Sequence, residues 1–229
     1  MNIVRSILLL PLLALTITSC TGGRMTLHPA ERIVFLGDSI TELGVKPDGY
    51  VTLIRETITA RHPDFALEVF GAGVSGNKVP DLQQRLARDV ISRKPRIVVI
   101  YIGINDVWHW ALKNLKGTSK QDFEAGLREI IARIQYSGSD VILCTPSVIG
   151  EKHDGTNPQD QMLEEYAGIS RSVALALGAR LCDLRKAFHS YLVLNNKENK
   201  SQGILTRDGV HLNDEGNKFV AQELLKFFE

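Results

Sequence analysis

The chain has 229 residues, of which 44% are hydrophobic and 23% are charged, and its formal net charge is +1. These values suit one α/β domain with a full core, and no break in composition marks a second domain. No basic run stands out, which argues against nucleic acid as a partner.

The N-terminus has the pattern of a secretion signal. Residues 1–5 form a short positive head, and residues 7–17 form an apolar stretch that is too short to span a bilayer comfortably. The segment Ile17-Thr-Ser-Cys20 is similar to a bacterial lipobox, with Cys20 as the acylated residue. An ordinary cleavage site followed by an incidental cysteine is the alternative.

This pattern predicts the domain organisation and the location of the protein. We expect export from a bacterial cytoplasm, with lipidated Cys20 as the only membrane anchor and the domain facing the periplasm or the cell surface. The expected division is a lipoprotein signal peptide at 1–19, a tether at 20–30 and one domain at 31–229.

Short apolar runs rich in isoleucine and valine alternate with helical patterns after residue 30. Such runs are typical of parallel strands that are covered on both faces. They predict strands at residues 32–36, 66–70, 96–102, 141–144 and 180–182.

Helical periodicity falls between these runs. Leu82, Leu86 and Val90 repeat every fourth residue, and longer apolar stripes cover residues 119–138 and 163–178. A last helix is expected at 214–228, with Asn213 as its N-cap. Alternating strands and helices predict a doubly wound, five-stranded parallel sheet of the α/β class.

Two stretches are expected to be irregular. Residues 147–160 are polar and predict a surface loop near the strand ends, where ligands bind in such folds. Residues 107–118 include Trp108 and Trp110. These indoles could line a pocket, although packing against the body of the protein fits the sequence equally well.

Ser39 is the candidate nucleophile. The segment Gly37-Asp-Ser39 directly follows the first predicted strand, so Ser39 falls on a strand-to-helix turn. A simple helix cap is the alternative interpretation of this segment.

His211 is the candidate base. Asp208 stands three residues before it, and the intervening Gly209 permits a turn that would let the acid hold the Nδ1 proton of the ring. A routine β-turn at Asp208-Gly209 and a core histidine are the alternatives.

Two further segments supply candidate oxyanion donors. Gly76 ends a glycine-rich segment after the second strand and can offer a backbone N–H, while Asn105 follows the third strand and can offer its side-chain amide. Each is weak alone. In a parallel sheet all four segments converge on one edge, and together they predict a catalytic site.

Taken together, these segments resemble the conserved blocks of the SGNH hydrolases, also called GDSL esterases and lipases. Gly37-Asp-Ser39, Gly76, Gly103-x-Asn105-Asp106 and Asp208-x-x-His211 carry the resemblance. It implies a three-layer α/β/α, flavodoxin-like fold and an esterase that needs no metal or organic cofactor.

The resemblance also implies a role for each residue. Ser39 is the expected nucleophile, His211 the base and Asp208 its orienting acid, while the Ser39 N–H, the Gly76 N–H and the Asn105 amide form the oxyanion hole. Asp38, Trp108 and Trp110 are further candidate substrate contacts. Many members carry an asparagine about five residues before the second-block glycine, where this chain has Gly71, so the usual support of that loop is in question.

The ester itself is left open by the sequence. An exported esterase could remove acetyl groups from carbohydrate, and stacking of Trp108 and Trp110 on sugar rings favours this substrate slightly. A lysophospholipase, a short-chain acyl esterase or a thioesterase is the alternative. The sequence does not indicate an oligomeric state.

Two interpretations outside catalysis are weaker. Gly71-x-Gly73-x-x-Gly76 has the spacing of a dinucleotide-binding fingerprint, but it follows the second strand, and the next strand does not end in the required acid. A non-catalytic surface module would be expected to have lost Ser39, Asn105 or His211, and all three are present.

Cys144 and Cys182 each lie in a predicted strand. A disulfide is possible in an oxidising compartment, but two buried free thiols on neighbouring strands are the plainer expectation.

Overall fold

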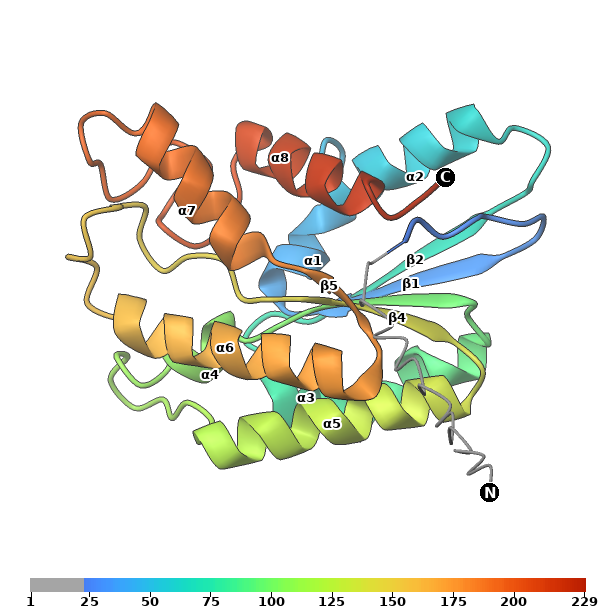
Figure 1. Cartoon of the computed structure of the whole chain (residues 1–229), viewed down its shortest axis with the longest axis horizontal. Coiled ribbons are helices and arrows are strands. Elements are labelled where there is room, and N and C mark those ends of the chain that lie inside the picture. The colour runs from blue at the N-terminus through green and yellow to red at the C-terminus, as the bar shows by residue number, and fades with distance from the viewer. Residues whose placement is uncertain (1–22) are drawn as a thin grey trace, which may run out of the picture.

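The computed structural model describes residues 23–229 and has three layers, with a parallel sheet between two layers of helices (Figure 1). The predicted α/β/α architecture is confirmed. The predicted signal peptide and Cys20 lie outside the described residues.

The sheet runs in the order β2-β1-β3-β4-β5, and all neighbouring strands are parallel. This order reverses the direction of winding between β1 and β3, as in flavodoxin-like folds. The strands are β1 (Arg32–Gly37), β2 (Glu68–Gly73), β3 (Ile97–Tyr101), β4 (Asp140–Cys144) and β5 (Arg180–Cys182).

Helices cover both faces of the sheet, which explains why β3 is buried along its whole length. The layer below the sheet in Figure 1 contains α3 (Val79–Asp89), α5 (Lys120–Tyr136) and α6 (Asp160–Leu177). The layer above it contains α2 (Tyr50–Arg61), α7 (Leu184–Asn195) and α8 (Asp214–Leu225). Three short helices complete the fold: α1 (Ser39–Gly44), the 3-10 helix η1 (Ile91–Arg93) and α4 (Ile104–Trp108).

The helical patterns in the sequence are largely confirmed. Ser119 caps α5 and Asn213 caps α8 through their side chains. Helix α8 ends at Leu225 instead of continuing to residue 228, and α2 and α7 lie outside the patterns that the periodicity singled out. None of the helices in residues 23–229 has the length and apolar character needed to cross a membrane.

Strand β2 lies further along the chain than residues 66–70. It includes Gly71 and Gly73, which the sequence interpretation assigned to a loop. Helix α1 passes directly over this strand, and a Cβ atom on Gly73 would lie 2.1 Å from the backbone nitrogen of Glu42. The glycines are therefore strand residues that let α1 approach, rather than turn residues.

Within the segment predicted as a tether, 20–30, some of the described residues pack against the folded body. Met25 and Leu27 are buried, and Met25 forms a parallel bridge with Phe228. The backbone N–H of Met25 donates to the Phe227 carbonyl at 2.7 Å. Phe227 and Phe228, which follow the end of α8, therefore make the contacts with the Met25 segment.

The irregular stretch after β4 is only partly a surface loop. Ser147, Val148 and Glu151 are buried, while the segment becomes exposed around Asp154 and Gly155. The polar composition of this stretch predicted solvent exposure. Several of its polar side chains instead form buried hydrogen bonds. Likewise, the stretch at 107–118 begins inside α4, which includes Val107 and Trp108.

Cys144 and Cys182 are both buried free thiols, as expected. They occupy partner positions on the neighbouring strands β4 and β5.

Candidate active site

Ser39 is the first residue of α1, two positions after β1 ends at Gly37. The helix cap that the sequence suggested is also present, but Asp38 provides it, since its Oδ1 accepts the N–H of Ile40 at 2.9 Å. The Ser39 hydroxyl is therefore not needed for capping. It lies 2.9 Å from the Nε2 atom of His211.

Asp208 holds the other side of the His211 ring. Its Oδ2 is 2.7 Å from Nδ1, and its Oδ1 accepts the backbone N–H groups of Val210 at 3.0 Å and His211 at 2.7 Å. Gly209 has a φ of +89°, a conformation that glycine adopts readily and that the turn requires. Ser39, His211 and Asp208 thus form a continuous hydrogen-bonded chain across 172 positions of sequence.

The two candidate donor segments adjoin this chain. The Asn105 side-chain amide donates to the carbonyl of Asn77, the residue after Gly76, at 3.1 Å. The backbone N–H of Val74 donates to the Gly37 carbonyl at 3.2 Å, so the same loop is attached to the end of β1. The structure therefore brings Ser39, Gly76 and Asn105 to one edge of the sheet.

Arg85 of α3 supports this loop from below. Its guanidinium donates to the Gly37 carbonyl at 2.7 Å, to the Ala72 carbonyl at 2.9 Å and to Asn77 Oδ1 at 2.7 Å. The side chain is buried and also pairs with Asp89. These contacts support the loop in a chain that has Gly71 where many SGNH hydrolases have asparagine.

Two buried carboxyl groups lie under the site. Burial, aided by the charge of Asp106, raises the pKa of Asp38 to about 7. Burial likewise raises the pKa of Asp106 to about 6. Asp106 accepts the N–H of Val79 at the start of α3, at 3.1 Å, so it joins α4 to that helix.

Asp208 behaves differently. Its partial burial raises the pKa, but hydrogen bonds from the His211 ring and from the His211 and Val210 backbone outweigh this and bring the pKa below its ordinary value. Asp208 is thus an anion at neutral pH. Its side chain is 45% exposed and that of His211 is 19% exposed, so the site opens to solvent.

The three candidate substrate contacts differ in their surroundings. The Trp108 ring meets the His211 ring edge-on, with centroids 6.3 Å apart. Trp110 is 43% exposed, and its indole packs over Gly117. This position agrees with packing against the body of the protein, the alternative to lining a pocket. Asp38 is only 1% exposed and caps α1, so its environment does not fit the expected substrate contact.

Sequence reasoning missed two buried charged residues that hydrogen-bond to backbone near the site: Arg85, and Glu151, whose carboxylate accepts the N–H groups of residues 204–206. Arg85 carried a usable signal, because it is a charge beside the apolar stripe of Leu82 and Leu86 on α3. Glu151 carried none, because it stands in a polar loop among other charged residues.

Comparison with known proteins places the chain in a family. Residues 35–219 match the GDSL-like lipase/acylhydrolase family. An acetylxylan esterase of Geobacillus stearothermophilus is 30% identical over 217 residues, which cover 88% of this chain and 95% of that protein. An isoamyl acetate-hydrolyzing esterase 1 homolog of Rattus norvegicus is 24% identical over 87% of this chain and 81% of that protein.

Solved structures agree. The crystal structure of an acetyl xylan esterase, AlAXEase, superposes with a TM-score of 0.82 at 45% identity, covering 84% of this chain and 97% of that chain. The acetylxylan esterase Axe2 of Geobacillus stearothermophilus superposes with a TM-score of 0.77 at 29% identity, over 90% of this chain and 98% of that one. Variants of Axe2 in which a serine, an aspartate or a histidine is replaced by alanine are described as catalytic mutants.

The fold, the hydrogen-bonded Ser-His-Asp chain and the family match define one class of protein: the chain belongs to the GDSL-like lipase/acylhydrolase family, that of the SGNH hydrolases. Within that class, it is a carboxylic ester hydrolase.

Proposed function

We propose that this protein is a serine esterase that removes acetyl groups from xylan or xylo-oligosaccharides. The observation that carries the proposal is the hydrogen-bonded chain of Ser39, His211 and Asp208, with distances of 2.9 and 2.7 Å. The names of the relatives favour an acetylated carbohydrate over a lysophospholipid or a thioester. The aspartate and histidine of the Axe2 catalytic mutants are three positions apart, as are Asp208 and His211.

In the proposed mechanism, Ser39 Oγ attacks the ester carbonyl while His211 Nε2 takes the hydroxyl proton. The carbonyl oxygen becomes an oxyanion, which accepts hydrogen bonds from the Ser39 N–H, the Gly76 N–H and the Asn105 amide. As the tetrahedral intermediate collapses, the imidazolium returns the proton to the departing sugar oxygen. The products are an acetyl-enzyme and a free sugar hydroxyl.

Deacylation repeats the same steps with water. His211 takes a proton from the water molecule that attacks the acetyl-enzyme, then gives it to Ser39 Oγ as acetate leaves. Asp208 keeps the ring in the required tautomer throughout, because its Oδ2 accepts the Nδ1 proton. No step needs a metal or an organic cofactor.

The open surroundings of the site suit a polysaccharide substrate. Asp208 is nearly half exposed, and Trp108, which is partly buried against the core, meets His211 edge-on, so the part of the indole that remains exposed lies beside the site. A long acyl chain would need an extended apolar groove for its tail, whereas an acetyl group does not.

The test is a substrate panel applied to protein that begins at Cys20. We expect acetate release from acetylated xylan, and hydrolysis of p-nitrophenyl esters that falls steeply from acetyl to octanoyl. Ser39→Ala should abolish both activities. Preference for octanoyl esters or for lysophosphatidylcholine would reject the acetyl-carbohydrate assignment while leaving the esterase assignment intact.

We further propose that the protein is a lipoprotein anchored through Cys20. Met25 is buried in the fold and follows Cys20 by five positions, so at most about 17 Å of extended chain separates the anchor from the body. The enzyme would therefore lie close to the membrane. Labelling cells with a palmitate analogue should tag the wild type and not Cys20→Ala, and equal labelling of both would end this proposal.

A further inference from the structure

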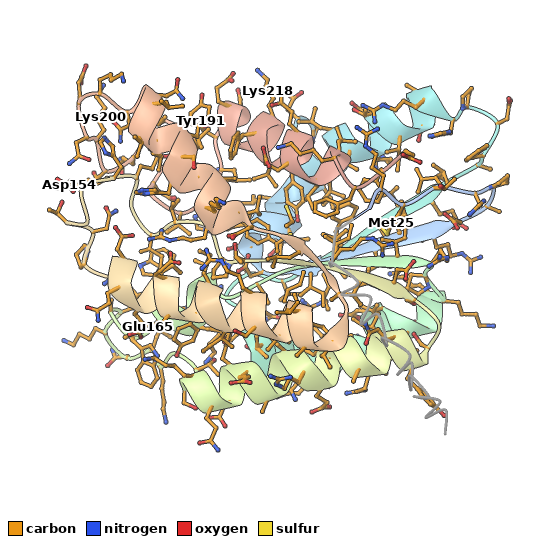
Figure 2. The ribbon with its side chains drawn as sticks, viewed as in Figure 1. Met25, Asp154, Glu165, Tyr191, Lys200 and Lys218 are labelled. Carbon is orange, nitrogen blue, oxygen red and sulfur yellow. The ribbon has the colours of Figure 1, made fainter. Side chains whose placement is uncertain are left out.

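Two loops meet at the site end of the molecule. One joins β4 to α6 and carries Asp154, and the other joins α7 to α8 and carries Lys200, as the labels in Figure 2 show. Asn199 Nδ2 donates to Asp154 Oδ2 at 2.6 Å, and the Gly150 N–H donates to the Gly209 carbonyl at 2.8 Å. The second loop contains Asp208 and His211, so the first loop is its immediate support.

Glu151 is the centre of this contact. Its side chain is fully buried, and its two carboxylate oxygens accept three successive backbone N–H groups. The donors are Ile204 at 2.7 Å and Leu205 and Thr206 at 2.6 Å each. The Glu151 backbone adds a fourth bond, since its N–H donates to the Ser201 carbonyl at 2.9 Å.

This arrangement requires a carboxylate. Three N–H groups point at two oxygens, and only an acidic side chain offers two acceptor atoms with no donor. In residues 23–229 no lysine, arginine or histidine forms an ion pair with Glu151. The backbone N–H groups therefore compensate for the burial of its charge, as in an anion-binding nest.

The same three residues lead directly to the Asp208–His211 turn. Thr206 Oγ1 accepts the N–H of Gly209 at 3.0 Å, and the Arg207 N–H donates to the His211 carbonyl at 2.9 Å. Behind the turn, the N–H of Asn213 donates to the Leu205 carbonyl at 3.0 Å. Glu151 thus holds residues 204–206, and residues within and after the Asp208–His211 turn hydrogen-bond to this segment.

From these contacts we infer that Glu151 is a positioning residue for the esterase reaction: its carboxylate fixes the Asp208–His211 turn so that His211 Nε2 meets Ser39 Oγ. This inference rests on the proposed roles of Ser39, His211 and Asp208. The hydrogen bonds of the Glu151 carboxylate in residues 23–229 run to the backbone of residues 204–206 and not to Ser39 or His211, so it acts through that backbone.

The test compares Glu151→Gln with Glu151→Asp. Glutamine has nearly the same size but turns an N–H₂ group toward backbone donors, so the loop must shift to relieve the conflict. We expect kcat for p-nitrophenyl acetate to fall by about a hundredfold, with little change in KM, because a small displacement of the base slows the chemistry and not binding. Aspartate keeps the charge and should restore part of the rate.

Ser139→Ala is the matched control. It removes a buried hydrogen bond, from Ser139 Oγ to the Pro95 carbonyl, at the opposite end of the strands. A second readout is the downfield ¹H NMR signal of the His211 Nδ1 proton, which reports the Asp208 contact directly. That signal should shift or vanish in Glu151→Gln and persist in Ser139→Ala, whatever either variant does to the melting temperature.

The outcomes separate this inference from the function on which it rests. Wild-type kcat and an unchanged Nδ1 signal in Glu151→Gln would overturn it, as would a rate loss that merely follows the unfolded fraction. Should Glu151→Gln not fold, the same two readouts on Glu151→Asp decide. Undiminished activity in Ser39→Ala would instead reject the proposed mechanism, independently of Glu151.

Discussion

Asp208 uses both of its oxygens, and the two have separate tasks. Oδ2 receives the His211 Nδ1 proton, while Oδ1 closes the turn through the Val210 and His211 N–H groups. An asparagine could satisfy one of these tasks, but its amide group cannot accept at both positions. Asp208 therefore orients the base.

This division predicts unequal losses from two substitutions. His211→Ala removes the base and should lower kcat by a factor on the order of 10⁶, whereas Asp208→Asn misorients a base that is still present and should cost on the order of 10⁴. Steady-state kinetics with p-nitrophenyl acetate measure both. Asp64→Asn, an exposed aspartate before β2, is the control. Comparable losses in the two variants would contradict the orienting role.

Asp38 predicts an effect on stability. Its carboxyl has a pKa of about 7 in the folded protein against an ordinary value of 3.8. Between these values the folded state holds a proton that the unfolded chain has released, so this group's contribution to the free energy of unfolding falls as the pH rises. Above pH 7 the fold must accommodate a buried charge beside Asp106.

Asp38→Asn should remove that penalty while keeping the cap on Ile40, because asparagine caps helices as well as aspartate does. We expect its melting temperature, relative to wild type, to be higher at pH 8 than at pH 5. Asp64→Asn should give the same difference at both pH values. If the difference in melting temperature from wild type is the same at both pH values for Asp38→Asn as well, the pKa of the Asp38 carboxyl is not raised in the folded protein.

At the scale of elements, α1 lies very close to β2 in the site region. Sequence reasoning placed the strand too early, since Gly71 and Gly73 suggested a turn. Their actual role depends on a helix that is adjacent only in the folded molecule, so local sequence patterns could not reveal it. The strands buried on both faces, such as β3, were predicted well because continuous apolar runs have few alternatives.

A pair of glycine substitutions tests this contact. In Gly73→Ala the new Cβ would lie 2.1 Å from the Glu42 backbone nitrogen, so α1 must move, and we expect destabilisation of at least about 1–3 kcal/mol. Gly168→Ala in α6 has no atom within 4 Å of the new Cβ and should stabilise by about 0.5–1 kcal/mol. Urea denaturation measures both. Equal free energies of unfolding for the two variants would show that α1 shifts without cost, which would contradict a tight contact between α1 and β2.

At the scale of the whole molecule, the sheet order explains why the site forms where it does. Ser39 follows β1 and Asn105 follows β3, and these neighbouring strands mark the point where the winding reverses. The motifs and the parallel sheet were sufficient to predict that Ser39, Gly76, Asn105 and Asp208-x-x-His211 converge. Of the two supports, Arg85 carried a signal as a charge beside the apolar stripe of α3, whereas Glu151 was not predictable, because it contacts backbone N–H groups that no side-chain pattern identifies.

The central claim is that Ser39 is the nucleophile and that His211 activates it. The most direct measurement is mass spectrometry of the intact and digested protein after reaction with a fluorophosphonate. We predict one equivalent of label, located on Ser39, with no label in Ser39→Ala and greatly slowed labelling in His211→Ala. Label on another residue, or wild-type labelling in His211→Ala, would contradict the account.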